Sequence, residues 1–373
     1  MDFELSQEQI MLRDSVVRFV QDHYDFAQRK ALAQTVLGHS DENWKIFAEM
    51  GWLALPFAEE NGGLGGQAVD VAVLTEALGS GITLEPLFSS ALLGGRMVET
   101  LGSDTQKSAI IPSVLAGETK LALAYSEPNA RFVLTYVETT AERSGEGFVL
   151  NGRKSVVLQA ASADRIIVVA RTSGGVADAK GLSAFVVDAE ASGLRRQDYP
   201  TVDGQRASDL WLENTPGELL GAEGCAAPAL NAVIDAATCA VCAEAVGVMQ
   251  AVLDITKEYV STRKQYGRAI GDNQVVQHRL VDMSIALEEA KAITEMTAMQ
   301  LDEGVPDISA QISAMKVKVG DAARFVGGQG LQLHGGIGMT DEYPVGHYYK
   351  RLMAIEAMFG DTNHHLNHFA SAI

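Results

Sequence analysis

The chain has little positive charge and few cysteines. It carries 29 Lys and Arg residues against 48 Asp and Glu, a net charge of −19. A chain this acidic lacks the broad basic surface with which proteins bind nucleic acid. Its three cysteines, Cys225, Cys239 and Cys242, form an odd set without a distant partner group, so no disulfide framework is expected. Cys239 and Cys242 fall inside a helical pattern, and we interpret them as small core residues rather than a redox pair.

Long hydrophobic runs and low-complexity segments are also missing. Hydrophobic residues make up 47% and charged residues 21% of the 373 residues, and only 9 are Pro, a composition typical of a globular protein. The most apolar stretch, residues 236–253, is interrupted by Glu244, so no membrane span is expected. The segment MDFELSQEQIMLRDSV is acidic and does not resemble a signal peptide. We therefore predict a cytoplasmic protein of two or three domains.

The hydrophobic period changes twice along the chain, which predicts an α+β protein. Residues 1–118 repeat at three and four residues, as helices do, with Ser40 as one expected helix cap. Residues 119–221 contain β-branched segments separated by turns such as Asn151-Gly152, and the helical period returns over residues 222–373. We predict an N-terminal helical domain, a middle β-sheet or barrel domain and a C-terminal helical bundle over these three ranges. The expected strand segments are LALAY, RFVLTYVETTAE, GFVL, RIIVVART and LSAFVVDAE, and the long helices lie near 225–262, 274–303 and 307–334.

Two segments could bind phosphate groups. The order helices, strands, helices excludes alternating βαβ units, and no Gly-x-Gly-x-x-Gly turn follows a strand, so a Rossmann site is not expected. The glycine-rich segment 334–344 instead follows a helix, where it could bring backbone N–H groups close to a ligand or simply end the helix. Segment 262–279 concentrates four cations, which suit a diphosphate or a solvated helix end equally well. These cations are Arg263, Lys264, Arg268 and Arg279.

Glu244 is the one ionisable carboxylate or base within residues 236–253. Its neighbours three and four positions away are apolar, so the carboxylate should be desolvated. Desolvation raises the pKa of a carboxyl group, as a general base near neutral pH requires. Small residues such as Gly247 would leave room for a flat ligand. The alternative is an ion pair with an arginine from another helix, such as Arg263 or Arg324, and the sequence does not decide between the two.

The C-terminal histidines do not predict a metal site. His364 and His368 share a helix face, with His365 between them. No carboxylate or cysteine pattern completes a ligand set around them. We therefore expect no metal.

Several motifs resemble those of acyl-CoA dehydrogenases, in order along the whole chain. EYVSTRKQYGRAIGDNQVVQHRLVDM resembles the helix–loop signature of that family, LQLHGGIGMTDEYPVGHYYKR resembles its Gln-x-x-Gly-Gly-x-Gly signature, and LALAYSEPNA is similar to its strand ending in Thr-Glu-Pro. The resemblance implies FAD as cofactor and a C-terminal four-helix bundle. It further implies FAD contacts by Tyr125 and Ser126 of the middle domain, by Arg263, Tyr266 and Gln274 toward a neighbouring subunit's FAD, and by Gln332, Gly335 and Gly336.

The residues at the expected active site depart from the family pattern. The catalytic Glu of the motif Tyr-Glu-Gly-Thr is replaced by Phe359. In some members of the family the base lies on the first long helix of the last domain, which is where Glu244 stands. This position agrees with the argument from its apolar setting, so we predict Glu244 as the base, with Asp361 as the second candidate. The flavin-facing Trp-x-Thr becomes residues 156–158, Val-Val-Leu, and Ala-Gly-Ser becomes residues 130–132, Ala-Arg-Phe. These variants look like the small subunits of pimeloyl-CoA-type dehydrogenases, which work with a different second subunit.

The predicted function is FAD-dependent α,β-dehydrogenation of an acyl-CoA to the trans-2-enoyl-CoA. The family implies electron-transfer flavoprotein as the electron acceptor and a homo- or hetero-tetramer, here with a second acyl-CoA dehydrogenase subunit. One alternative is a non-catalytic subunit that completes the FAD site of its neighbour. Glu244 favours catalysis, whereas the missing flavin-facing Thr, Ser and Trp favour the alternative. A third hypothesis is an oxidase or monooxygenase on the same fold.

Overall fold

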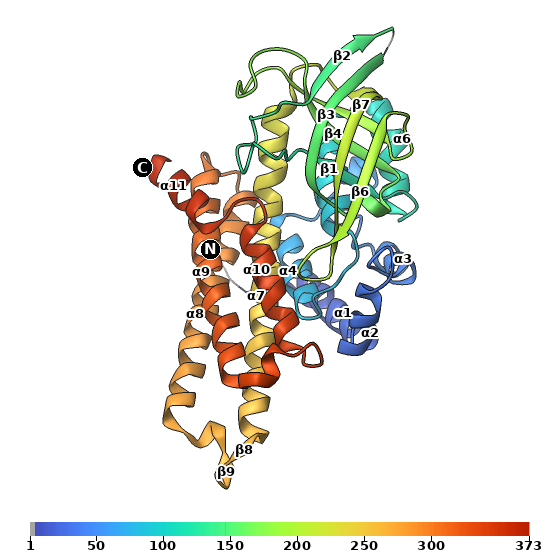
Figure 1. The fold of residues 1–373 in the computed structure, drawn as a ribbon. Helices are drawn as coiled ribbons and strands as arrows, with labels where there is room; N and C mark the ends of the chain where they lie inside the picture. The colour runs from blue at the N-terminus through green and yellow to red at the C-terminus, as the bar shows by residue number, and fades with distance from the viewer. Residues whose placement is uncertain (1–3, 146, 373) are drawn as a thin grey trace. The chain divides into compact units, whose positions relative to one another are not determined.

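The computed structural model describes residues 4–145 and 147–372, and it runs from helices through strands to helices (Figure 1). This order confirms the predicted α+β class. The first three residues of the acidic N-terminal segment lie outside the described residues. The chain groups into two compact units: a helical unit of Met1–Lys30, Ala68–Thr83 and Thr238–Ile373, and a barrel unit of Ala31–Gln67 and Leu84–Ala237. The predicted domain boundaries near residues 118 and 221 stay predictions.

The helices of the barrel unit begin at well-defined caps. Ser40 accepts a hydrogen bond from the N–H of Asn43, which confirms the predicted cap of α3 (Asp41–Glu49). Ser103 and Gln106 form a reciprocal capping box at the start of α6 (Asp104–Leu115). Such caps satisfy backbone N–H groups that have no partner within the helix. The unit also contains η1 (Glu59–Asn61), the π-helix η2 (Phe88–Gly95) and α5 (Arg96–Leu101).

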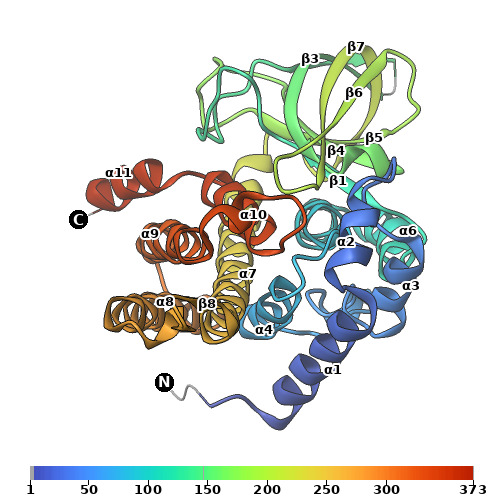
Figure 2. The ribbon, with the colours of Figure 1, turned by 60° about the horizontal axis from the view of Figure 1, so that its bottom comes forward.

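Five strands of the barrel unit close into a ring. Strand β4 pairs with β2 and with β5, while β2 continues through β3 and β7 back to β5. Strand β1 adds to β4 and strand β6 to β7, and the curved sheet is seen in Figure 2. Its interior is filled by apolar side chains such as Leu150, Val168 and Phe185. The strands are β1 (Leu121–Ala124), β2 (Thr140–Ser144), β3 (Gly147–Leu158), β4 (Arg165–Arg171), β5 (Leu182–Asp188), β6 (Leu194–Pro200) and β7 (Arg206–Leu220).

Two local predictions for this unit are wrong. Residues 131–139, expected as part of a strand, form turns followed by irregular backbone, and β2 begins only at Thr140. The Arg171 guanidinium donates to carbonyl oxygens at Thr135 and Val137, so a side chain satisfies this backbone in place of a strand partner. The predicted Asn151-Gly152 turn is a register shift inside β3. A Cβ at Gly152 would lie 2.5 Å from a side-chain atom of Thr139, so only glycine fits there.

The helical unit contains α1, α4, most of α7 and the helices that follow it. Three long helices confirm the predicted segments within one residue at each end: α7 (Ala226–Thr262), α8 (Gln274–Asp302) and α9 (Ile308–His334). In the described residues, α7 is the one helix long and apolar enough to cross a membrane, and 83% of its most apolar window is buried within the protein. That burial is typical of a core helix. Helix α2 (Phe26–Ala33) is divided between the two units after Lys30. The other elements of the helical unit are α1 (Gln7–His23), α4 (Ala68–Gly79), β8 (Lys264–Gln265), β9 (Arg268–Ala269), η4 (Ile270–Asp272), η5 (Gly335–Met339), α10 (Val345–Ala357) and α11 (Thr362–Ala372).

Candidate functional site

Three of the predicted cofactor residues lie on one exposed hairpin of the helical unit. Arg263 follows the last residue of α7, Tyr266 lies between β8 and β9, and Gln274 is the first residue of α8 (Figure 1). The Ile270 N–H donates to the Arg263 carbonyl at 2.9 Å and so closes the hairpin. The side chains of Arg263, Tyr266 and Gln274 are all exposed. The hairpin therefore presents a cation, an aromatic ring and an amide to whatever binds there.

The glycine-rich loop that follows α9 faces open space. Gly335 has a φ of 65°, and its N–H donates to carbonyls of the last turn of α9, so the loop does end the helix. A Cβ placed on Gly335 or on Gly336 would meet no atom within 4 Å. A ligand can thus approach the backbone closely at both positions. Gln332, one turn earlier, is also exposed.

A stack of rings joins the hairpin to the glycine loop. The Tyr259 ring, four residues before Arg263, stacks on His334 with ring centroids 4.4 Å apart, and its hydroxyl donates to the His334 carbonyl at 3.4 Å. The Tyr343 ring packs against both, with its centroid 5.9 Å from that of Tyr259 and 5.0 Å from that of His334. These contacts bring the end of α7 beside the residue that precedes Gly335. The predicted cofactor residues of the helical unit are therefore gathered at one end of it.

In the barrel unit, Tyr125 and Ser126 follow β1 directly. A buried ion pair holds the backbone at this position, with Lys154 Nζ 2.6 Å from Glu127 Oε1 and both side chains at most 1% exposed. Lys154 also donates to the Tyr125 carbonyl at 3.4 Å, and the Ser155 N–H donates to the Ser126 carbonyl at 3.0 Å. Burial raises the pKa of Tyr125 and lowers the pKa of Lys154 to about 8. No local pattern in the sequence indicated this pair, because its members are 27 residues apart.

Val156 occupies the position where the resemblance expected a tryptophan. It has a φ of 53°, a conformation that β-branched residues rarely adopt, and its side chain is 55% exposed. The Val156 N–H donates to Asp209 Oδ1 at 3.2 Å, which helps to hold the backbone in this shape. Exposure and backbone strain at one residue are typical of a functional surface.

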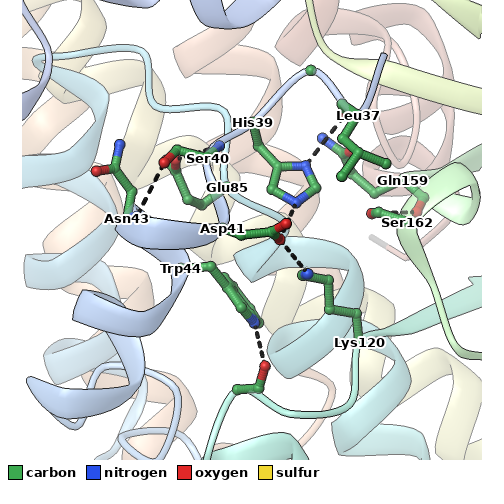
Figure 3. A network of polar contacts seen from close by, with 12 residues as sticks. Leu37, His39, Ser40, Asp41, Asn43, Trp44, Glu85, Lys120, Gln159 and Ser162 are labelled. Carbon is green, nitrogen blue, oxygen red and sulfur yellow. Dashed lines mark hydrogen bonds and ion pairs between the residues drawn. The ribbon is translucent and has the colours of Figure 1, made fainter. Parts of the chain in front are cut away.

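A polar network anchors the start of β1 to α3 (Figure 3). His39 is buried, with Nδ1 3.2 Å from the Leu37 carbonyl and Nε2 3.7 Å from Asp41 Oδ1. Lys120, the residue before β1, donates to the same Asp41 oxygen at 2.7 Å. Burial lowers the pKa of His39, and Lys120 lowers it further. The network fixes the start of the strand that leads to Tyr125, and no spacing in the sequence indicated it.

Glu244 is buried, as predicted, but it is not isolated. Its side chain accepts two hydrogen bonds of 2.6 Å from Arg351, one on each carboxylate oxygen, and the two residues are 4% and 3% exposed. The ion-pair alternative is thus the one observed, with a partner other than the two suggested. Arg263 lies on the hairpin, and Arg324 pairs with Asp321 and Glu356. The guanidinium matches both carboxylate oxygens in a bidentate geometry.

The expected space beside Glu244 is filled by helix α4. A Cβ at Gly247 would lie 1.8 Å from the carbonyl oxygen of Glu76, and a Cβ at Gly79 would lie 2.3 Å from the carbonyl oxygen of Glu244. The small residues therefore let the backbones of α4 and α7 touch. The expectation of room for a flat ligand next to Gly247 is wrong, because small residues at helical spacing serve helix packing here.

Asp361, the second predicted base, immediately precedes α11. Its carboxylate accepts the His364 N–H at 2.7 Å and thereby caps that helix. The side chain is half-buried. It follows Phe359 and Gly360, which have φ values of 59° and 123°.

Cysteine and metal chemistry find little support in the described ranges 4–145 and 147–372. No group of three or more His, Cys, Asp or Glu there could hold a metal ion. Cys239 and Cys242 are buried free thiols. Burial raises the pKa of both thiols, that of Cys242 to about 12, so neither is a reactive thiolate at neutral pH.

Comparison with known proteins identifies the family. The chain matches the acyl-CoA dehydrogenase N-terminal domain over residues 6–118, the middle domain over 122–215 and the C-terminal domain over 229–373. It is 30% identical over 352 residues to the mitochondrial 2-methylacyl-CoA dehydrogenase of Solanum tuberosum, covering 92% of this chain and 84% of that protein. The chain belongs to the acyl-CoA dehydrogenase family. This membership confirms the predicted three-part fold and the predicted class, a flavin-dependent oxidoreductase of CH–CH bonds, and it does not favour a non-catalytic partner subunit.

Two solved structures resemble the chain over nearly its whole length. The FAD complex of PigA has a TM-score of 0.91 at 26% identity and covers 100% of this chain and 99% of its own. A variant of the steroid acyl-CoA dehydrogenase Tcur3481-Tcur3483 has a TM-score of 0.88 at 26% identity and covers 98% and 97%. Both are similar to this chain in fold and sequence.

Proposed function

We propose that this chain oxidises an acyl-CoA thioester to the trans-2-enoyl-CoA with FAD as the oxidant. The observation that carries the proposal is the gathering of Arg263, Tyr266 and Gln274 beside an open glycine loop at one end of the helical unit. A backbone that faces open space at Gly335 and Gly336, next to an exposed cation, fits a dinucleotide with a diphosphate. FAD binding by the similar PigA supports this choice.

The chain's own residues would bind and orient the reactants. Gly335 and Gly336 would approach the cofactor with their backbone, Arg263 would neutralise phosphate charge, and Gln332 would donate hydrogen bonds. In the barrel unit, Tyr125 and Ser126 would face the flavin ring. When bound, FAD accepts the hydride that leaves the β-carbon. The α-proton passes to a carboxylate, and hydrogen bonds to the thioester oxygen must acidify it at the same moment.

Both predicted bases remain proposals, and the geometry ranks Asp361 before Glu244. Each oxygen of Glu244 is engaged by Arg351 at 2.6 Å, so protonation would break a buried bidentate pair. Breaking such a pair costs about 3–5 kcal/mol. Asp361 is half-buried, and its carboxylate accepts a hydrogen bond of 2.7 Å from the N–H of His364.

The helical unit also supports the proposed assembly. Large apolar side chains are exposed on it, some on α8 and α9 and some on the glycine loop, and such surfaces mark subunit interfaces. We propose a tetramer in which the hairpin contacts the FAD of a neighbouring subunit. That neighbour is a copy of this chain or a second acyl-CoA dehydrogenase subunit, as the two names in Tcur3481-Tcur3483 suggest. Electron-transfer flavoprotein is the proposed electron acceptor and the cytoplasm the proposed location. The exposed apolar residues on α8, α9 and the glycine loop are Val275, Val281, Ile285, Phe325, Ile337 and Met339.

The test is the visible absorbance of the purified chain, alone and co-expressed with a candidate partner subunit, followed by anaerobic addition of acyl-CoA thioesters of several sizes. A flavin spectrum that bleaches on adding one of these thioesters supports the proposal. Asp361→Asn and Glu244→Gln are compared with Glu289→Gln, a carboxylate exposed in a surface ion pair. Loss of bleaching in Asp361→Asn alone identifies the base as Asp361. A flavin-free protein with and without its partner would refute the proposed function.

A further inference from the structure

The loop between α10 and α11, residues 358–361, has an unusual backbone. Phe359 has a φ of 59° and is followed by Gly360 with a φ of 123°. Bulky L-residues rarely adopt a left-handed conformation, so neighbouring groups must hold the loop in place. The same loop ends at Asp361, the favoured proposed base. What holds the loop therefore sets where that carboxylate stands.

Lys316, in the middle of α9, supplies the central contact. Its side chain is 1% exposed, and its ammonium group donates hydrogen bonds of 2.9 Å to the carbonyls of Ile355, Glu356 and Gly360. The first two carbonyls belong to the last turn of α10, where partners within the helix run out. The third belongs to the loop. All three N–H donors of one ammonium group are used, and together they tie Gly360 back onto the end of α10.

The ammonium group brings a buried positive charge to the loop. Its three hydrogen bonds go to neutral carbonyls. Burial lowers the pKa of Lys316, while Cys242, Glu356 and Asp361 act in the opposite direction. A buried cation without a directly bonded carboxylate is costly to keep. Methionine would fill the same space without that cost, so packing alone does not explain why a lysine stands here.

A second contact from α9 holds the start of the loop. Ser313 lies three residues before Lys316 on the same helix face, and its hydroxyl is 3.1 Å from His365 Nδ1. The other ring nitrogen of His365, Nε2, is 3.2 Å from the Phe359 carbonyl. The Phe359 peptide is therefore fixed by a side chain that α9 itself positions.

The next two turns of α9 hold the end of the loop. Gly320 allows Thr362 to approach closely, since a Cβ at Gly320 would lie 2.6 Å from the Thr362 hydroxyl. Arg324 donates to Glu356 Oε1 at 2.8 Å, and the same oxygen accepts the Thr362 N–H at 3.1 Å. One face of α9, at spacings of three and four residues, thus contacts the loop on both sides of Asp361.

We infer that Lys316 is a positioning residue for the reaction, because it fixes the backbone of residues 358–361 and so the place of Asp361 beside the acyl-CoA. The inference rests on the proposed function for its catalytic part. The hydrogen bonds by which Lys316 holds the loop, called the clamp below, do not depend on the proposed function and can be tested without measuring turnover.

The test compares Lys316→Met with Lys318→Met, a lysine on the same helix that is exposed and paired with Glu289. Hydrogen exchange followed by mass spectrometry reports the clamp. We expect exchange in peptides covering residues 358–366 to rise about tenfold in Lys316→Met, with no change over 274–302 and no change in Lys318→Met. Ser313→Ala, which removes one hydroxyl, should give a smaller increase in exchange at the same residues. This variant replaces Lys316→Met in the test if Lys316→Met does not fold. Unchanged exchange in these peptides would overturn the inference.

Steady-state kinetics separate positioning from plain stability. With FAD content unchanged, kcat of Lys316→Met should fall by about 10²-fold, whereas KM for the acyl-CoA should change little. The reason is that the variant displaces the base but removes no group that binds the substrate. Faster exchange with an unchanged kcat would reduce Lys316 to a structural clamp and overturn the catalytic part. If the wild-type chain oxidises no acyl-CoA, the proposed function fails, and the exchange experiment still decides the clamp.

Discussion

The buried pair of Glu244 and Arg351 yields the sharpest prediction. Arg351→Met removes the cation and leaves a carboxylate that is 4% exposed without its bidentate partner. Loss of one partner of a buried ion pair destabilises a protein by about 3–5 kcal/mol. Glu244→Leu removes the carboxylate that accepts both short hydrogen bonds from Arg351 and should cost a similar amount. The double variant Glu244→Leu/Arg351→Met replaces the pair with apolar side chains of similar volume and should return to within about 1 kcal/mol of the wild type.

The assay is thermal unfolding followed by circular dichroism at one protein concentration and fixed cofactor. At about 2 °C per kcal/mol, each single variant should lower Tm by about 6–10 °C, and the double variant should recover most of that loss. The control is Glu289→Gln, in an exposed pair with Lys318, which should shift Tm by less than about 2 °C because exposed pairs contribute at most about 1 kcal/mol.

Activity of the same variants then decides the role of Glu244. If the carboxylate serves only the ion pair, the double variant folds and keeps its turnover. Losses in the two single variants that simply add in the double variant would refute the reasoning, because they would mean that the two side chains contribute independently. A stable double variant without turnover, next to an active Asp361→Asn, would instead restore Glu244 as the base.

Three further predictions follow from single residues. Lys154→Met should lower stability by about 3–5 kcal/mol and reduce FAD content, because it leaves the buried partner carboxylate uncompensated; unfolding as late as the wild type would contradict this. Burial lowers the pKa of His365 to about 4. Between pH 6.5 and pH 4 the His365 imidazole therefore binds a proton mainly in the unfolded chain, and the free energy of unfolding should fall by about 3 kcal/mol over this range. His365→Gln should flatten the pH dependence of Tm over this range, and an equally steep loss in that variant would show that other groups cause it. Gly247→Ala should cost about 3 kcal/mol because its Cβ would meet backbone at 1.8 Å, whereas Gly328→Ala, with open space around the Cβ, should be neutral or stabilising; equal Tm values for the two would refute the close packing of α4 and α7.

Local pattern was enough for most of the fold. The helical periods located α7, α8 and α9 within a residue at each end, and Ser40 marked the start of α3, because caps and apolar spacing act between residues close in the chain. The same reasoning failed at residues 131–139. There the β-branched pattern was real, but the Arg171 side chain took the place of a neighbouring strand.

The candidate site divides in the same way. Its predicted cofactor residues lie in short segments whose motifs could be read directly, so breaks between helices near Arg263 and Gly335 were expected from sequence alone, whereas the hairpin formed by β8 and β9 was not. The state of Glu244 could not be read in this way, since its apolar surroundings are local but its partner is 107 residues away. Lys316 gave no signal at all, because three backbone carbonyls from another helix and its loop define its role.

The sequence by itself determined the element order and the family, because these depend on periodicity and on motifs a few residues long. Only the tertiary structure decided which buried charges are paired and where small residues make room. The sequence shows that a carboxylate lies on an apolar helix face, but not whether a guanidinium from another helix pairs with it. The free energy of a buried charge depends on that contact, which only the packing of the helices provides.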